Sequence, residues 1–159
     1  MKQKKVKRII PNAGQTEFIA LAKKFNKDKT KKEFCLDGSG GTGKTTIIKE
    51  LFLKEDKKNP KIFHVSNSVI GVTVSHKARI ILNEQLPNCI TYAAAVNMSI
   101  EFDAWGEMVF VPKNGEFKQS KLYGYKYIVF DEASMVSDEM REILQMSCSP
   151  NAKIIYLGK

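Results

Sequence analysis

The sequence FCLDGSGGTGKTT occupies residues 34–46 and decides the fold of this chain. Its central part, Gly38 to Thr45, fits the pattern G-x-x-x-x-G-K-[ST] of a phosphate-binding loop. Apolar residues at 34–36 predict a short buried strand before the loop, and residues 46–52 predict a helix after it that runs to about Lys54. Strand, glycine-rich loop and helix in this order form the context that the motif requires. The sequence therefore predicts a P-loop fold rather than a glycine-rich turn without a ligand.

The residue types in this loop suit a phosphate ligand. Glycines reach backbone conformations that are closed to other residues, so successive N–H groups can converge on phosphate oxygens. Lys44 adds a positive charge for the β- and γ-phosphates, and the Thr45 hydroxyl is placed to bind Mg²⁺. We expect the phosphates of ATP to be bound by Gly38, Ser39, Gly40, Gly41, Thr42, Gly43, Lys44, Thr45 and Thr46.

Length and composition indicate one domain in a reducing compartment. The chain has 159 residues, and its 43% hydrophobic content is enough for a packed core. No apolar run approaches the length of a membrane span, and the basic start lacks the apolar core of a signal peptide. Three widely spaced cysteines have no metal-ligand spacing and are typical of reduced thiols. We therefore expect a cytoplasmic protein without a membrane partner.

The positive charge is concentrated in the first part of the chain. The formal net charge is +9, and residues 1–61 carry 17 basic and 7 acidic side chains, against 9 and 10 in residues 62–159. A basic face would suit nucleic acid, although runs of lysine are often only solvated surface. Nearly all of the basic residues are lysines, which fit phosphate contacts better than base reading.

Helices and strands alternate along residues 11–159. Asn12 is expected to cap a helix over residues 15–25, where apolar side chains recur at helical spacing. Apolar runs at 62–65 and 69–74 predict one long strand or two short ones, with the second run favoured as the core strand. Further strands are expected at 90–92, 127–130 and 154–157, and helices at 78–82, 93–98 and from 137 onward. This alternation predicts an α/β fold, a parallel sheet with helices on both faces, preceded by a basic arm over residues 1–10.

Residues 99–125 interrupt the alternation. Residues 107–111 predict a strand, residues 112–115 a turn and residues 116–118 the returning strand of a β-hairpin. Because this hairpin lies between two α/β units, we expect it to be an insertion into the sheet domain.

An apolar strand at 127–130 ends in Asp131 and Glu132, the Walker B arrangement. Asp131 would hold Mg²⁺, directly or through water, and Glu132 would activate the water that attacks the γ-phosphate. Such hydrolysis needs charge neutralisation and a positioned nucleophile more than covalent help. We expect Lys44 and Glu132 to be the catalytic residues, and Thr45 and Asp131 to hold the metal.

Three segments together resemble superfamily 1 helicases: Gly38–Thr46, Val74–Ala78 and Asp131–Met135. The closest resemblance is to the RecD/Dda-like 5′→3′ DNA helicases, many of them phage proteins, which typically read Asp-Glu-x-Ser-Met in the third segment. The resemblance covers about Pro11 to Gly158. It implies a RecA-like ATP-binding motor domain over residues 11–159 that uses ATP and Mg²⁺ to move on single-stranded DNA and to open a duplex fork, in a bacterial or phage-infected cell.

The resemblance also implies roles for residues outside the phosphate loop. Gln15 matches the family's adenine-recognising glutamine, and residues 156–158 resemble the opening of motif III. The inserted hairpin lies where this branch has its strand-separating pin, and its aromatic side chains either pack on the parent sheet or stack on bases. The implied nucleic-acid contacts are Ser75, His76 and Lys77 of motif Ia, Thr91 of motif Ib and Phe110 of the hairpin.

The sequence departs from the family at two positions. Val74 stands where proline is usual, and Lys159 stands where the family has aspartate. The second RecA-like domain, with its arginine finger, is absent from this chain, so we expect the isolated chain to hydrolyse ATP slowly or not at all. Two other functions stay open: a stand-alone P-loop NTPase such as a nucleotide kinase, and a non-catalytic nucleic-acid-binding module.

Overall fold

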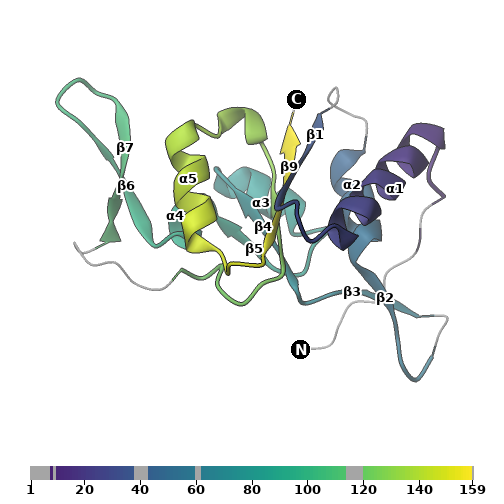
Figure 1. Ribbon diagram of the computed structural model, residues 1–159. Helices are drawn as coiled ribbons and strands as arrows, with labels where there is room; N and C mark the ends of the chain where they lie inside the picture. Colours follow the sequence, from purple (N-terminus) through teal and green to yellow (C-terminus); the bar gives the residue numbers. More distant parts are fainter. Residues whose placement is uncertain (1–7, 9, 38–42, 60–61, 114–119, 159) are drawn as a thin grey trace.

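Five parallel strands form the central sheet, in the order β1-β9-β8-β4-β5 (Figure 1). The strands are β1 (Glu33–Asp37), β4 (Val69–Thr73), β5 (Cys89–Thr91), β8 (Tyr127–Phe130) and β9 (Lys153–Gly158). The computed structural model describes residues 8, 10–37, 43–59, 62–113 and 120–158. It confirms the predicted parallel α/β sheet, in which Leu36, Val72, Val129 and Ile155 all take part.

Helices cover both faces of the sheet, as predicted. One face carries α1 (Ala13–Lys27), α2 (Lys44–Ile48) and α3 (His76–Leu82), and the other carries α4 (Tyr92–Ala95) and α5 (Asp138–Ser147). The side chains of a strand alternate between the two faces. Thus Ile128 and Phe130 of β8 pack on the side of α4 and α5, while Val129 packs on the side of α1.

Helix ends are set by local chemistry. The Asn12 side chain accepts from the backbone N–H of Gln15 and the Gln15 side chain accepts from that of Asn12, so a capping box begins α1. Ser137 caps α5 in the predicted way by accepting from the N–H of Met140. At the other end of α1, the Lys153 ammonium donates to the carbonyls of Phe25, Asp28 and Lys31 and so ties this helix to β9.

The strand before the phosphate loop is more exposed than predicted. Cys35 is exposed, and Phe34 and Leu36 are only half-buried. The reason is that β1 lies at the edge of the described sheet and pairs only with β9. Burial of a strand depends on its neighbours, which local hydrophobicity does not report.

The helix predicted to run to about Lys54 ends earlier. After α2 the chain makes a 3₁₀ turn, η1 (Lys49–Phe52), and then enters the strand β2 (Leu53–Glu55). This strand pairs antiparallel with β3 (Phe63–Val65), away from the central sheet. The two apolar runs of residues 62–74 are therefore two separate strands, and the second run, β4, is the core strand as favoured.

Close packing holds α3 against β4. A Cβ at Gly71 would lie 2.6 Å from Leu82 Cδ2 and 2.8 Å from Cys89 Sγ, distances shorter than real Cβ contacts. Only a glycine fits between this helix and the neighbouring strand β5. The fully buried β4 is thereby covered on both faces.

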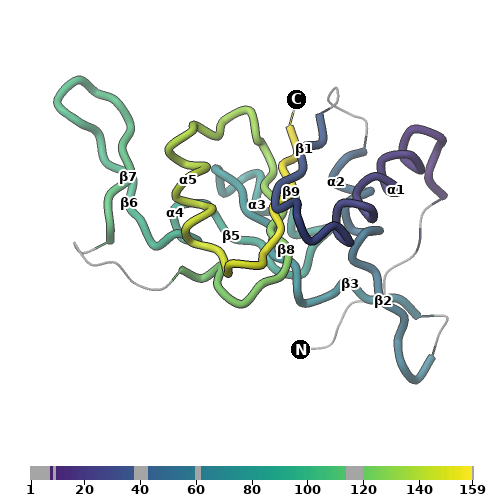
Figure 2. Tube along the Cα trace, viewed as in Figure 1, coloured from purple at the N-terminus to yellow at the C-terminus, as the bar shows by residue number. Residues whose placement is uncertain are grey.

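The inserted hairpin exists but has another register than predicted. It consists of β6 (Met98–Phe102) and β7 (Met108–Pro112), joined by a turn at residues 103–107 (Figures 1 and 2). The Asp103 carboxylate accepts from the N–H groups of Trp105 and Glu107, and Gly106 supplies a positive φ of 79°. The turn at 112–115 and the helix to residue 98 were therefore wrong, because Asp103 and Gly106 organise a tighter turn.

Other sequence expectations fall partly outside the described residues. Of the predicted basic arm, Arg8 lies over the Phe63 ring at 5.2 Å and its Nε is 3.5 Å from Glu50 Oε2. Residues 1–7, 9 and the expected returning strand at 116–118 lie outside the described part. Within that part, no helix has the length and apolar content needed to cross a membrane.

Candidate functional site

The carboxyl ends of the parallel strands meet at one edge of the sheet, where ligands of open α/β sheets bind. There β1 leads into the phosphate-loop sequence, and β8 leads into Asp131 and Glu132. The first helix after the loop, α2, begins at Lys44. The expected phosphate contacts of Gly38, Ser39, Gly40, Gly41 and Thr42 lie outside the described residues and stay predictions.

Gly43 links the loop to α2 in a conformation that suits glycine. Its φ of 73° and ψ of 27° lie in the left-handed region. A Cβ at this position would lie 3.3 Å from Gln15 Nε2. The backbone reversal at Gly43 determines the direction in which the next residue, Lys44, leaves the chain.

Lys44 lies at the shared edge of the sheet. Its Nζ donates to the carbonyl oxygen of Gly158 at 2.5 Å. A Cβ at Gly158 would in turn lie 3.3 Å from Ala133 Cβ and 3.9 Å from the backbone nitrogen of Ser134. The end of β9 therefore lies between the phosphate-loop lysine and the segment that follows Glu132.

Gln15 lies beside the phosphate loop, as its expected role requires. Its backbone N–H and its Oε1 form the capping box of α1, and its Nε2 approaches Gly43. The capping box thus holds the side chain at the entrance of α2. Recognition of adenine by Gln15 stays a prediction.

Asp131 and Glu132 have the geometry of a strained functional turn. The backbone N–H of Asp131 extends the sheet by donating to the Val72 carbonyl, and Asp131 Oδ1 accepts from the N–H of Glu132. Glu132 has a left-handed backbone, with φ of 60° and ψ of 42°. Its Oε2 is buried and has no hydrogen-bond partner among the described residues. A strained backbone together with a buried unpaired carboxylate oxygen indicates a site built for a ligand.

The residues present fit Mg²⁺ and a nucleotide. Within the described residues, no group of three or more histidine, cysteine, aspartate or glutamate side chains could form a metal cage by itself. Magnesium in phosphoryl-transfer sites takes one or two protein oxygens and completes its shell with water and phosphate. Thr45 and Thr46, half-buried in the first turn of α2, and Asp131 at the end of β8 supply oxygens of this kind.

The expected single-strand contacts differ in exposure. His76 and Lys77 are exposed at the start of α3, on the same edge of the sheet as the phosphate loop. The Ser75 hydroxyl accepts from the N–H of Ala78 and so serves as the N-cap of this helix. These three residues keep their predicted role, with Ser75 also positioning the other two.

Thr91 and Phe110 are less available to a ligand. Thr91 is 8% exposed and pairs in register with Thr73 of β4. The Phe110 ring packs edge-on against Tyr92, with ring centroids 5.0 Å apart. The structure therefore supports packing of Phe110 on the parent domain. The exposed aromatic side chains of the described hairpin are Phe102 and Trp105.

Sequence reasoning missed the Gly158 carbonyl as a partner of Lys44. A backbone oxygen has no signature in a sequence, so no pattern could have identified it. The structure also argues against catalysis by two of the cysteines. Burial raises the pKa of the Cys89 thiol to about 11 and that of Cys148 to about 12, which keeps both protonated at neutral pH.

Comparison with known proteins agrees with this geometry. A family model described as an AAA domain matches residues 22–159, which include the phosphate loop, the Asp131–Glu132 turn and the end of β9. No curated protein matches the sequence. With most of its length covered by that match, the chain belongs to the AAA domain family and is a nucleotide-binding P-loop NTPase module of the helicase type.

Proposed function

We propose that this chain is the ATP-binding motor domain of a DNA helicase of the RecD/Dda-like 5′→3′ branch. In this role it would couple ATP hydrolysis to movement along single-stranded DNA and to opening of a duplex, together with a second RecA-like domain. The observation that carries the proposal is the buried, unpaired Oε2 of Glu132 at the edge of the sheet where Lys44 also lies.

The described residues supply the groups that hydrolysis needs. Lys44 would hold the β- and γ-phosphates, and Thr45 and Asp131 would hold Mg²⁺. The bound metal would neutralise charge on the phosphates. Glu132 would orient a water molecule and accept its proton, a task that suits a carboxylate held in a fixed backbone turn.

A nucleotide would also compete for the bond between Lys44 and Gly158. Phosphate oxygens carry more charge than a carbonyl oxygen and make stronger hydrogen bonds with an ammonium group. Lys44 would therefore turn from the Gly158 carbonyl to the phosphates. Because Gly158 also contacts Ala133, this exchange would link the nucleotide to both halves of the site.

The inserted hairpin supports a role at a DNA fork. Paired residues of β6 and β7 share a face: Ile100 lies opposite Phe110, and Phe102 lies opposite Met108. The base of this apolar face packs on the domain, but Ile100, Phe102 and Met108 are 44%, 72% and 48% exposed. The hairpin projects from the body of the domain (Figure 1). Exposed aromatic side chains on such a ribbon can stack on bases.

The test compares nucleotide binding and its stimulators. The chain should bind Mg²⁺-ATP, and Lys44→Ala should remove most of that affinity, because the motif offers no substitute charge. With a second motor domain supplied, single-stranded DNA should stimulate hydrolysis, whereas a panel of nucleotide phosphate acceptors should not. Unchanged affinity in Lys44→Ala, or phosphate transfer to an acceptor nucleotide, would contradict the proposal.

A further inference from the structure

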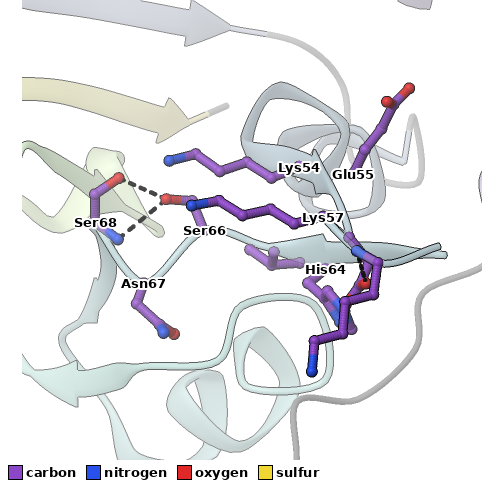
Figure 3. A pocket seen from close by; sticks show the side chains of 10 residues that line it. Lys54, Glu55, Lys57, His64, Ser66, Asn67 and Ser68 are labelled. Atoms are coloured by element: carbon purple, nitrogen blue, oxygen red, sulfur yellow. Dashed lines mark hydrogen bonds and ion pairs between the residues drawn. The ribbon is translucent and has the colours of Figure 1, made fainter. Parts of the chain in front are cut away.

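A cavity of about 640 Å³ lies away from the candidate nucleotide site, between the β2–β3 pair and residues 66–68 (Figure 3). These residues lead into the amino end of β4, whereas the phosphate loop follows the carboxyl end of β1. The two strands run parallel in one sheet, so the cavity lies at the opposite edge. The five residues of β4, at about 3.3 Å each, separate the two edges by roughly 16 Å.

Two lysine side chains point into this cavity. Lys54 lies on β2 and Lys57 in the loop after it, and Figure 3 shows both side chains extending toward Ser66 and Ser68. Lys58 also lines the cavity. Two ammonium groups that converge in this way create a local excess of positive charge that suits an anion.

The serines facing these lysines have a hydroxyl proton to offer. Ser66 is 8% exposed, and its Oγ accepts from the N–H of Ser68. The two hydroxyl oxygens are 2.7 Å apart. Because Ser66 Oγ already accepts one hydrogen bond, its own proton can go to Ser68, which leaves the Ser68 hydroxyl to donate outward.

The carboxylates that line the cavity do not face the ammonium pair. Asp56 Oδ2 is 3.0 Å from His64 Nε2, and Asp56 Oδ1 accepts from the N–H groups of Lys58 and Asn59. Glu55 follows Lys54 on a strand and so lies on its other face. Figure 3 shows the Glu55 side chain pointing away from the serines. The charge that faces Ser66 and Ser68 is therefore positive.

We propose that this cavity is a second anion site, which binds a phosphate group of a nucleic-acid backbone. Lysines and a hydroxyl donor suit a phosphodiester and do not read bases. The lysines belong to the first 61 residues, which carry the positive excess of the chain. Such a site anchors nucleic acid on the edge of the domain opposite Lys44, and it needs no ATP hydrolysis.

The salt dependence of binding tests this site. We would measure the affinity of the chain for a labelled single-stranded oligonucleotide by fluorescence anisotropy over a range of salt concentrations. Each phosphate that a protein neutralises in a single strand adds about 0.7 to the slope of log K against log salt. The double variant Lys54→Ala/Lys57→Ala should lower that slope by about 0.7 to 1.4, because one or two phosphates are then no longer neutralised. Ser68→Ala should weaken binding while leaving the slope nearly unchanged.

The matched control removes the same charge elsewhere. Lys23→Ala/Lys24→Ala alters two exposed lysines of α1 and should leave the slope unchanged. Both double variants should keep the parent's far-UV circular dichroism, melting temperature and affinity for Mg²⁺-ATP. Equal slopes in the two double variants would overturn the proposal. So would equally tight binding of polyglutamate through the same lysines, since that would identify an acidic polypeptide as the ligand. Loss of ATP binding in Lys44→Ala tests the proposed function separately and does not affect this result.

Discussion

Substitution of Gly43 by alanine would separate backbone strain from loss of nucleotide binding. Gly43 has φ of 73° and ψ of 27°, and an L-residue in this region costs about 1–2 kcal/mol. The added Cβ would also lie 3.3 Å from Gln15 Nε2, so the end of that side chain must shift. Because Gln15 Oε1 accepts from the N–H of Asn12, the shift would also weaken the capping box of α1.

The structure supplies a matched control in the hairpin. Gly106 has a φ of 79°, and a Cβ there would meet nothing within 4 Å. Gly106→Ala should therefore cost the same backbone strain of about 1–2 kcal/mol, without a change near the phosphate loop. For a domain of this size that corresponds to a fall in melting temperature of about 2–8 °C. Gly43→Ala should lower the melting temperature by at least as much.

Nucleotide binding should distinguish the two variants. If alanine relaxes the backbone at Gly43, binding must restore the left-handed turn, and 1–2 kcal/mol weakens the affinity for Mg²⁺-ATP by about 5–30-fold. Gly106→Ala should bind as the parent does. Far-UV circular dichroism suits the melting curves, because the single tryptophan, Trp105, is 87% exposed and reports on the hairpin alone. Parent-like affinity in Gly43→Ala, or an equal loss in Gly106→Ala, would refute the reasoning.

Three further predictions address the hairpin, the edge of the sheet and the carboxylate turn. Phe110→Ser should lower the free energy of unfolding by about 1–3 kcal/mol through weaker packing on Tyr92, whereas Trp105→Ser should stay within about 0.5 kcal/mol in urea denaturation; equal effects would contradict the packing of Phe110. Hydrogen bonds from Arg141, Gln145 and Tyr156 hold the pKa of Glu33 below its usual 4.5, so its stabilisation is present above about pH 4.5 and is lost as the pH falls through the lower folded value. Glu33→Gln should therefore show a shallower loss of stability below that pH in urea midpoints measured at several pH values, and a curve parallel to the parent's would exclude this role. Glu132→Gln should keep the affinity for Mg²⁺-ATP but lower DNA-stimulated hydrolysis by about 10²–10⁴-fold when the second motor domain is supplied, and turnover equal to the parent's would rule out Glu132 as the base.

Local sequence signals predicted the elements whose causes are local. Asn12 and Ser137 cap their helices because a side chain needs only the next three residues to do so. The strands β4, β8 and β9 follow from apolar runs that are buried on both faces. The strand ending at Asp131 could be found because parallel order brings strand ends to one edge.

Elements that depend on neighbours distant in the sequence were predicted less well. The hairpin turn was expected at residues 112–115, although Asp103 and Gly106 carry a turn signal of their own. Pairing of β6 with β7 selects between the two turns, since it places Phe110 against Tyr92. In the same way, β2 continues a predicted helix in the sequence but pairs with β3 in the fold.

The sequence by itself determined the chemistry of the candidate site: a glycine-rich loop with Lys44 and Thr45, and a strand that ends in Asp131 and Glu132. These follow from residue types at fixed spacing, because phosphate and Mg²⁺ need particular donors and charges. Only the tertiary structure decided that Lys44 meets the Gly158 carbonyl and that Lys54 and Lys57 face Ser66 and Ser68 across a cavity. The physical reason is that these contacts depend on backbone atoms and strand pairing, which bring together groups without a shared spacing in the chain.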